Sequence, residues 1–108
     1  MPQDAQKGLA VIQQQLRELD RIFQDTMETL NTASGMERVA KWKAKTVIAL
    51  TEAVDQKAGQ DFARIQPGPS FTNDLVEEFT DLIDCFKIPL TALSKTLSQA
   101  GSRPLSGG

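Results

Sequence analysis

The sequence predicts an all-α fold, an antiparallel bundle of three long helices. Ala, Gln, Leu, Glu and Lys are abundant, tyrosine is absent and alternating Val/Ile runs are rare, so helix-forming residues dominate. Three segments repeat apolar residues at steps of three and four, the period of a helix with one buried stripe. Similar lengths and short connections favour antiparallel neighbours.

The first predicted helix covers about residues 8–33, after a polar segment, residues 1–7, that is expected to fray. Its apolar stripe runs through Leu9, Ile12, Leu16, Leu19, Phe23, Thr26 or Met27, and Leu30. This spacing is also that of a coiled coil. Two arrangements are therefore open. The stripe packs inside the chain's own bundle, or residues 8–33 project as a dimerising coiled coil beside a helical hairpin formed by residues 36–99.

The second predicted helix begins near Met36 and ends near residue 58, with Gly59 as a candidate cap, or it runs on or restarts up to about residue 65. The segment before it, NTASG, ends the first helix, because Ser34 and Gly35 are typical of a helix end. The apolar face of the second helix is wide and contains small residues, which let neighbouring helices approach closely. It comprises Met36, Val39, Ala40, Trp42, Thr46, Val47, Ala49, Leu50, Ala53 and Val54.

The third predicted helix spans about residues 71–99. Its apolar stripe consists of Leu75, Phe79, Leu82, Phe86, Leu90, Leu93 and Leu97. The helix follows the segment QPGPS at residues 66–70, where two prolines around a glycine cannot continue a helix. Three polar residues are candidate N-caps: Ser70, Thr72 and Asn73. The proline inside this helix, Pro89, predicts a kink near Cys85–Phe86.

Residues 1–100 are interpreted as a single helical domain and residues 101–108 as a flexible tail. A net charge of −2 provides no general attraction to nucleic acid or to an anionic membrane. The single cysteine, Cys85, cannot form an intramolecular disulfide and fits a reducing compartment. Without an apolar run long enough to span a membrane, the chain is expected to be soluble and cytoplasmic.

Catalytic and cofactor chemistry are not expected. The sequence contains no histidine, the commonest general base and metal ligand, and no glycine-rich phosphate-binding loop. The acids of the third helix lie off its apolar stripe, unlike the inward-facing acids of di-metal helical bundles. We therefore expect no catalytic, cofactor-binding or metal site and no small-molecule substrate.

Two charged clusters are the candidate partner-binding residues. The basic cluster, at the start of the second helix, consists of Arg38, Lys41, Trp42, Lys43 and Lys45. The acidic cluster, at the start of the third helix, consists of Asp74, Glu77, Glu78 and Asp81. Cations at a helix start oppose the helix dipole, so a partner is expected to compensate them. In an antiparallel hairpin the clusters lie at opposite ends, where they can pair between two molecules but not within one.

These observations predict a non-catalytic helical module for protein–protein interaction or oligomerisation, with a homodimer as the expected assembly and another protein as the other partner. The alternative is a small nucleic-acid-binding regulator, in which the bases contact phosphate and Trp42 stacks on a nucleobase. A compact helical module with a linker-like tail resembles the interaction domains that accompany bacterial effector or regulatory proteins, although no motif carries this resemblance.

Overall fold

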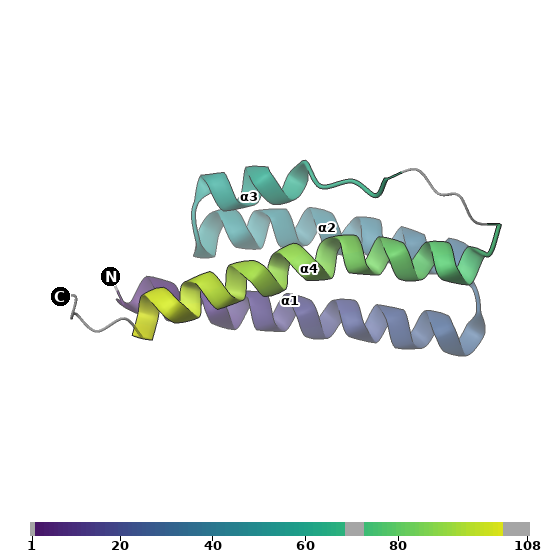
Figure 1. Ribbon diagram of the computed structural model, residues 1–108, viewed down its shortest axis with the longest axis horizontal. Coiled ribbons are helices and arrows are strands. Elements are labelled where there is room, and N and C mark those ends of the chain that lie inside the picture. The colour runs from purple at the N-terminus through teal and green to yellow at the C-terminus, as the bar shows by residue number, and fades with distance from the viewer. Residues whose placement is uncertain (1, 69–72, 103–108) are drawn as a thin grey trace.

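The computed structural model describes residues 2–68 and 73–102, which form four helices and no strand (Figure 1). The all-α class is therefore confirmed. The helices are α1 (Pro2–Thr29), α2 (Thr32–Ala53), α3 (Gln56–Ala63) and α4 (Leu75–Ser102). Three of them are long, and the short α3 is the restart after the second helix that the sequence leaves open as an alternative.

α1 and α2 form a hairpin that turns at residues 30 and 31. Leu30 has a φ of 58°, the left-handed conformation that usually belongs to glycine at a helix end. The Asn31 side chain caps α2 by accepting a hydrogen bond of 3.1 Å from the Ser34 amide. Ser34 and Gly35 consequently lie inside α2, and the prediction that they end the first helix is wrong.

α2 ends at Ala53 because Asp55 starts a new helix. The backbone of Asp55 is extended, and its carboxylate accepts a hydrogen bond of 2.7 Å from the Ala58 amide, which makes it the N-cap of α3. The prediction that the second helix continues to residue 58 or 65 is therefore wrong. α3 folds back along α2 at close range, since a Cβ on Gly59 would overlap Thr51 Oγ1.

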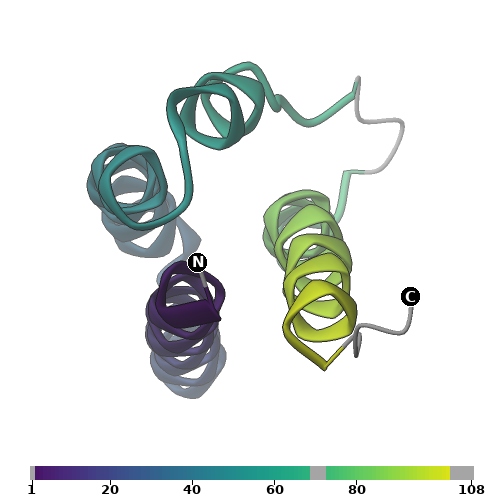
Figure 2. The ribbon, with the colours of Figure 1, turned by 90° about the vertical axis from the view of Figure 1, so that its left-hand side faces the viewer.

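α4 runs antiparallel to α1 and parallel to α2 (Figures 1 and 2). At one end of the bundle Gly35, near the start of α2, faces Thr26 of α1 and Phe79 of α4. At the other end Gly8, near the start of α1, faces the last turns of α2 and α4. This arrangement differs from the predicted up-down-up order, because α3 and the segment after it return the chain to the end where α2 begins.

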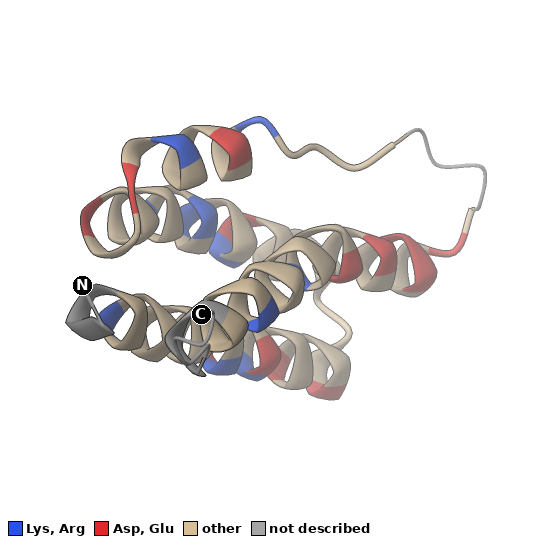
Figure 3. Ribbon diagram, turned by 60° about the vertical axis from the view of Figure 1, so that its left-hand side comes forward, with Lys and Arg blue, Asp and Glu red and all other residues tan. Residues whose placement is uncertain are grey.

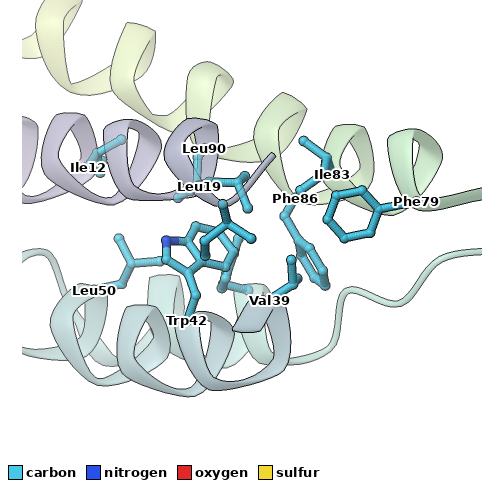
Figure 4. Packing of buried hydrophobic residues seen from close by; sticks show 11 residues of the cluster. Ile12, Leu19, Val39, Trp42, Leu50, Phe79, Ile83, Phe86 and Leu90 are labelled. Atoms are coloured by element: carbon cyan, nitrogen blue, oxygen red, sulfur yellow. The ribbon is translucent and has the colours of Figure 1, made fainter. Parts of the chain in front are cut away.

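The core is centred on α1, which packs against both α2 and α4. Ile12 and Leu19 of the α1 stripe are fully buried. Across from them three aromatic rings cluster, with centroid separations of 5.8 Å for Trp42–Phe62, 5.9 Å for Trp42–Phe86 and 5.6 Å for Phe62–Phe86 (Figure 4). The apolar stripe of α1 thus packs inside the chain, and residues 8–33 do not project from the bundle.

Asp74 begins α4 by accepting hydrogen bonds from the amides of Val76, at 2.9 Å, and Glu77, at 3.3 Å. Of the predicted caps, Asn73 precedes this residue, while Ser70 and Thr72 lie outside the described residues. α4 continues through Pro89 to Ser102, so the proline does not end it. The kink near Cys85–Phe86 stays a prediction, and residues 103–108 of the predicted tail lie outside the described residues.

Candidate partner-binding surfaces

Trp42 belongs to the core and not to the basic surface of α2. Its side chain is 4% exposed, and its indole Nε1 donates a hydrogen bond of 2.9 Å to the backbone carbonyl of Gln15. Gln15 is buried as well, although its neighbours in the sequence suggest the polar side of α1. The indole ring is therefore not available to stack on a nucleobase in the folded protein.

Two bases of the basic cluster pair with acids of α1. Arg38 Nη1 lies 3.1 Å from Asp25 Oδ2, and the Lys45 ammonium donates a hydrogen bond to the Glu18 carboxylate. Because α2 begins at Thr32, these bases lie in its second to fourth turns, and the prediction that they stand at a helix start and oppose its dipole is wrong. Part of their charge is compensated within the molecule by the acids of α1.

Of the other two lysines of the cluster, only Lys43 points away from the surface on which these ion pairs lie. Lys43 Nζ donates a hydrogen bond of 2.7 Å to the backbone carbonyl of Ile65, beyond α3, and lies 5.2 Å from the centroid of the Phe86 ring. Lys41 is exposed on α2 and takes part in none of the ion pairs found among the described residues. The predicted basic cluster is therefore brought together only in part, since Lys43 does not line the surface depression of about 270 Å³ that is shared by Arg38, Lys41 and Lys45.

The broader basic face of the molecule is built jointly by α1 and α2. Arg17 and Arg21 of α1 join Arg38 of α2 around a surface depression of about 350 Å³. Sequence reasoning missed the two α1 arginines as part of this face. The signal for them is their spacing of i and i+4, which places them on one side of a helix.

The ion pair between Lys45 and Glu18 shifts the pKa of the Glu18 carboxyl in a direction that can be measured. The hydrogen bond from Lys45 lowers the pKa of the Glu18 carboxyl. A pKa that is lower in the folded state stabilises the protein above the ordinary glutamate range, and this stabilisation is lost as the pH falls through the folded value. Because the pair is largely exposed, its contribution is at most about 1 kcal/mol.

We expect Lys45→Met to raise the pKa of Glu18 towards its ordinary value, as measured by an NMR pH titration of the Glu18 carboxyl carbon. Lys41→Met removes the same charge from the same helix and is the matched control, which should leave the Glu18 titration unchanged. An unchanged pKa in Lys45→Met would show that the pair does not persist in solution.

The acidic cluster lies at the start of α4, at the same end of the molecule as the start of α2 (Figure 3). The prediction that the two clusters lie at opposite ends is wrong, because α4 runs parallel to α2. Even so, no ion pair within the described part of the chain joins Glu77, Glu78 or Asp81 to a base. These three carboxylates are therefore placed to meet charges from outside the molecule.

One flank of the core, between α3 and α4, is not closed by helix packing. α3 packs on α2 and α4 packs on α1, but extensive contact between α3 and α4 is missing from the described part of the chain. The end-on view in Figure 2 shows α3 and α4 on neighbouring sides of the bundle. They meet through the rings of Phe62 and Phe86, whose centroids are 5.6 Å apart, but their backbones do not pack closely as in a closed four-helix bundle.

Two cavities follow one another along α4 on this flank, and together we call them the α4 groove. The first has a volume of about 300 Å³ and is lined by Met36, Pro67, Gly68, Glu78, Asp81, Leu82 and Cys85. The second has a volume of about 410 Å³ and is mostly apolar, lined by Leu50, Ala58, Asp61, Phe62, Ile65, Pro89, Leu90, Ala92, Leu93 and Thr96. Several of these side chains are only half-buried, including Leu82, Cys85 and Leu93.

The α4 groove lacks the groups of a reactive site. Burial raises the pKa of the Cys85 thiol, which therefore stays protonated near neutral pH and is a poor nucleophile. Among the described residues, no group of three or more His, Cys, Asp and Glu side chains is placed to hold a metal ion. The groove is thus suited to binding by shape, apolar contact and charge.

No protein-family model, curated protein or solved structure matches the chain. Of the helices in the described part of the chain, none combines the length and the apolar character needed to cross a membrane.

Proposed function

We propose that this protein is a non-catalytic helical interaction module that binds an amphipathic helix of another protein in the α4 groove. The observation that carries the proposal is the half-buried apolar stripe of α4 that α3 does not cover. A helix laid along this stripe would complete the bundle and bury the stripe against a second apolar face. The net gain would come from apolar surface removed from water.

The dimensions of the groove support a helical occupant. From Glu78 to Thr96 the groove follows α4 for about 27 Å, since a helix rises 1.5 Å per residue. A partner helix of about five turns would cover this length. Such a helix would present apolar side chains at steps of three and four, as in other helix-in-groove complexes.

The distribution of exposed apolar residues favours another protein over a second copy as the source of this helix. The large exposed apolar side chains outside the groove are widely separated along the sequence and do not form a helical stripe: Leu30 between α1 and α2, Ile48 on α2, and Leu75 and Ile88 on α4. None of the described helices therefore offers a second exposed stripe that would fit the groove of another copy. A homodimer held by the charged clusters is the competing assembly.

A selection of helical peptides from an unbiased displayed library tests the proposed function. The selected peptides are expected to protect Cys85 from alkylation. They should also bind Ala92→Glu at least roughly tenfold more weakly than the wild type, because a glutamate at this exposed position places a charge in the apolar cavity. Ile48→Glu, which adds the same charge on the outer face of α2, is the matched control and should bind normally.

Peptides that bind both variants equally and leave Cys85 reactive would contradict the groove as the binding surface. Sedimentation velocity of the chain alone distinguishes the competing assembly. A monomer at all concentrations is expected, whereas a dimer that dissociates at high salt would favour a homodimer held by exposed charges.

The nucleic-acid alternative retains only part of its basis. With Trp42 in the core, the basic face of α1 and α2 would contact phosphates without reading bases. Binding of this kind would be independent of sequence and strongly weakened by salt.

A further inference from the structure

The charges that line the α4 groove indicate the chemistry of its partner, an inference that rests on the proposed function. Glu78 and Asp81 line the first cavity and Asp61 lines the second, and no lysine or arginine lines either cavity. Asp61 forms an ion pair of 2.9 Å with Lys57 on its own helix. Glu78 and Asp81 take part in no ion pair found among the described residues.

Two bases near the groove, Lys43 and Lys57, are already engaged. Lys43 Nζ lies between the two cavities, where it donates to the Ile65 carbonyl at 2.7 Å and faces the Phe86 ring. Lys57 is paired with Asp61, and Arg64 follows on the same side of the bundle at the end of α3. The first cavity is thus acidic, and the second is close to neutral and apolar.

We propose that the occupant of the α4 groove is a cationic amphipathic helix whose lysines or arginines gather at one end. Its apolar side chains cover Leu82 and Leu93, and its basic end lies beside Glu78 and Asp81. Complementary charges at the rim of an interface speed association and determine register, while the apolar contacts supply most of the affinity. The uneven distribution of charge along the groove therefore specifies which end of the partner lies where.

The helix dipoles determine the direction of the partner. Cations are most favourable in the last turn of a helix, so the basic end of the partner is its C-terminal end. That end lies beside the start of α4, where Glu77 and Glu78 occupy the first turn. The partner consequently runs antiparallel to α4, which also places the negative end of its dipole against the positive end of α4.

Three synthetic helical peptides test the charge of the partner. They share one apolar face and carry Lys, Gln or Glu at the same positions near the C-terminus, and their binding is measured by fluorescence anisotropy at low and high salt. The Lys peptide is expected to bind at least roughly tenfold more tightly than the Glu peptide at low salt, and the difference should shrink at high salt.

Variants of the protein locate this effect. The double variant Glu78→Gln, Asp81→Asn is expected to weaken binding of the Lys peptide and to leave binding of the Gln peptide unchanged. The matched control is Glu28→Gln, Glu52→Gln, which removes the same charge from exposed positions of α1 and α2. Circular dichroism of each variant verifies that the helices are retained.

The outcomes separate this inference from the proposed function. Two results would overturn the cationic partner and leave the groove as the binding surface. In one, the Gln peptide protects Cys85 but the Lys peptide binds no more tightly than the Gln or Glu peptide. In the other, the Glu78→Gln, Asp81→Asn variant binds the Lys peptide as tightly as the wild type does. If none of the three peptides binds or protects Cys85, the proposed function falls with it. The direction of the bound helix is tested by disulfide trapping with Cys85. A cysteine near the basic end of the peptide should form the disulfide. Preferential reaction of a cysteine at the other end would overturn the antiparallel orientation.

Discussion

Replacing Trp42 with alanine is expected to lower the free energy of unfolding by about 3–5 kcal/mol. The indole is 4% exposed, packs against the rings of Phe62 and Phe86, and donates a hydrogen bond to the Gln15 carbonyl. Its removal leaves a cavity where α1, α2, α3 and α4 meet. A loss of this size is a large share of the roughly 5–15 kcal/mol that keeps small proteins folded.

Urea unfolding followed by circular dichroism measures this effect, since the variant lacks the single tryptophan of the sequence. Trp42→Phe keeps a ring and loses the hydrogen bond, so its unfolding free energy should lie between those of the wild type and Trp42→Ala. Ile48→Ala, at a position that is 59% exposed, is the control and should change stability by less than about 0.5 kcal/mol. A comparably small loss for Trp42→Ala would place the ring at the surface and revive base stacking.

Thr46→Val is expected to cost about 1–3 kcal/mol although it preserves the shape of the side chain. Thr46 Oγ1 donates a hydrogen bond of 3.0 Å to Gln15 Oε1, and the two residues are 0% and 6% exposed. Valine leaves this amide oxygen buried without its donor. The cost is the desolvation of the unpaired oxygen, because water cannot reach it in the folded protein.

A double-mutant cycle by urea unfolding tests this explanation. Adding Gln15→Leu to Thr46→Val should recover most of the lost stability, because an apolar pair leaves no buried polar group unsatisfied. Thr91→Val, which removes a hydroxyl from an exposed position of α4, should have little effect. Additive costs of the two core substitutions would mean that packing, and not the hydrogen bond, determines them.

The fold class and the approximate buried side of α1 and α4 are predictable from the amino-acid sequence, although Leu30 and Leu75 of the predicted stripes are exposed. Ile12 and Leu19 on α1, and Phe79, Phe86 and Leu90 on α4, are buried as their spacing predicts. This information is local, since a period of three and four places apolar side chains on one side of a helix wherever that helix packs. The acidic character of the start of α4 is also predicted by the sequence.

Helix boundaries were only partly predictable, because several residues competed for the same role. Asn31 and Asp55 cap α2 and α3, yet the Ser34–Gly35 pair and Gly59 were the expected markers of helix ends. In the structure both glycines serve close packing instead, Gly35 against Thr26 and Phe79 and Gly59 against Thr51. A glycine signals either role, and only its neighbours in space distinguish them.

The tertiary structure alone decided the surfaces on which function depends. The direction of α4, the burial of Trp42 and Gln15 and the α1 partners of Arg38 and Lys45 all follow from contacts between distant segments. α3 and the segment after it return the chain to the end where α2 begins, so the acidic cluster lies at that end while the basic cluster occupies the middle of α2, and a flank of α4 is only partly covered. Periodicity specifies which side of a helix is apolar, whereas the path of the chain determines which neighbour each side meets.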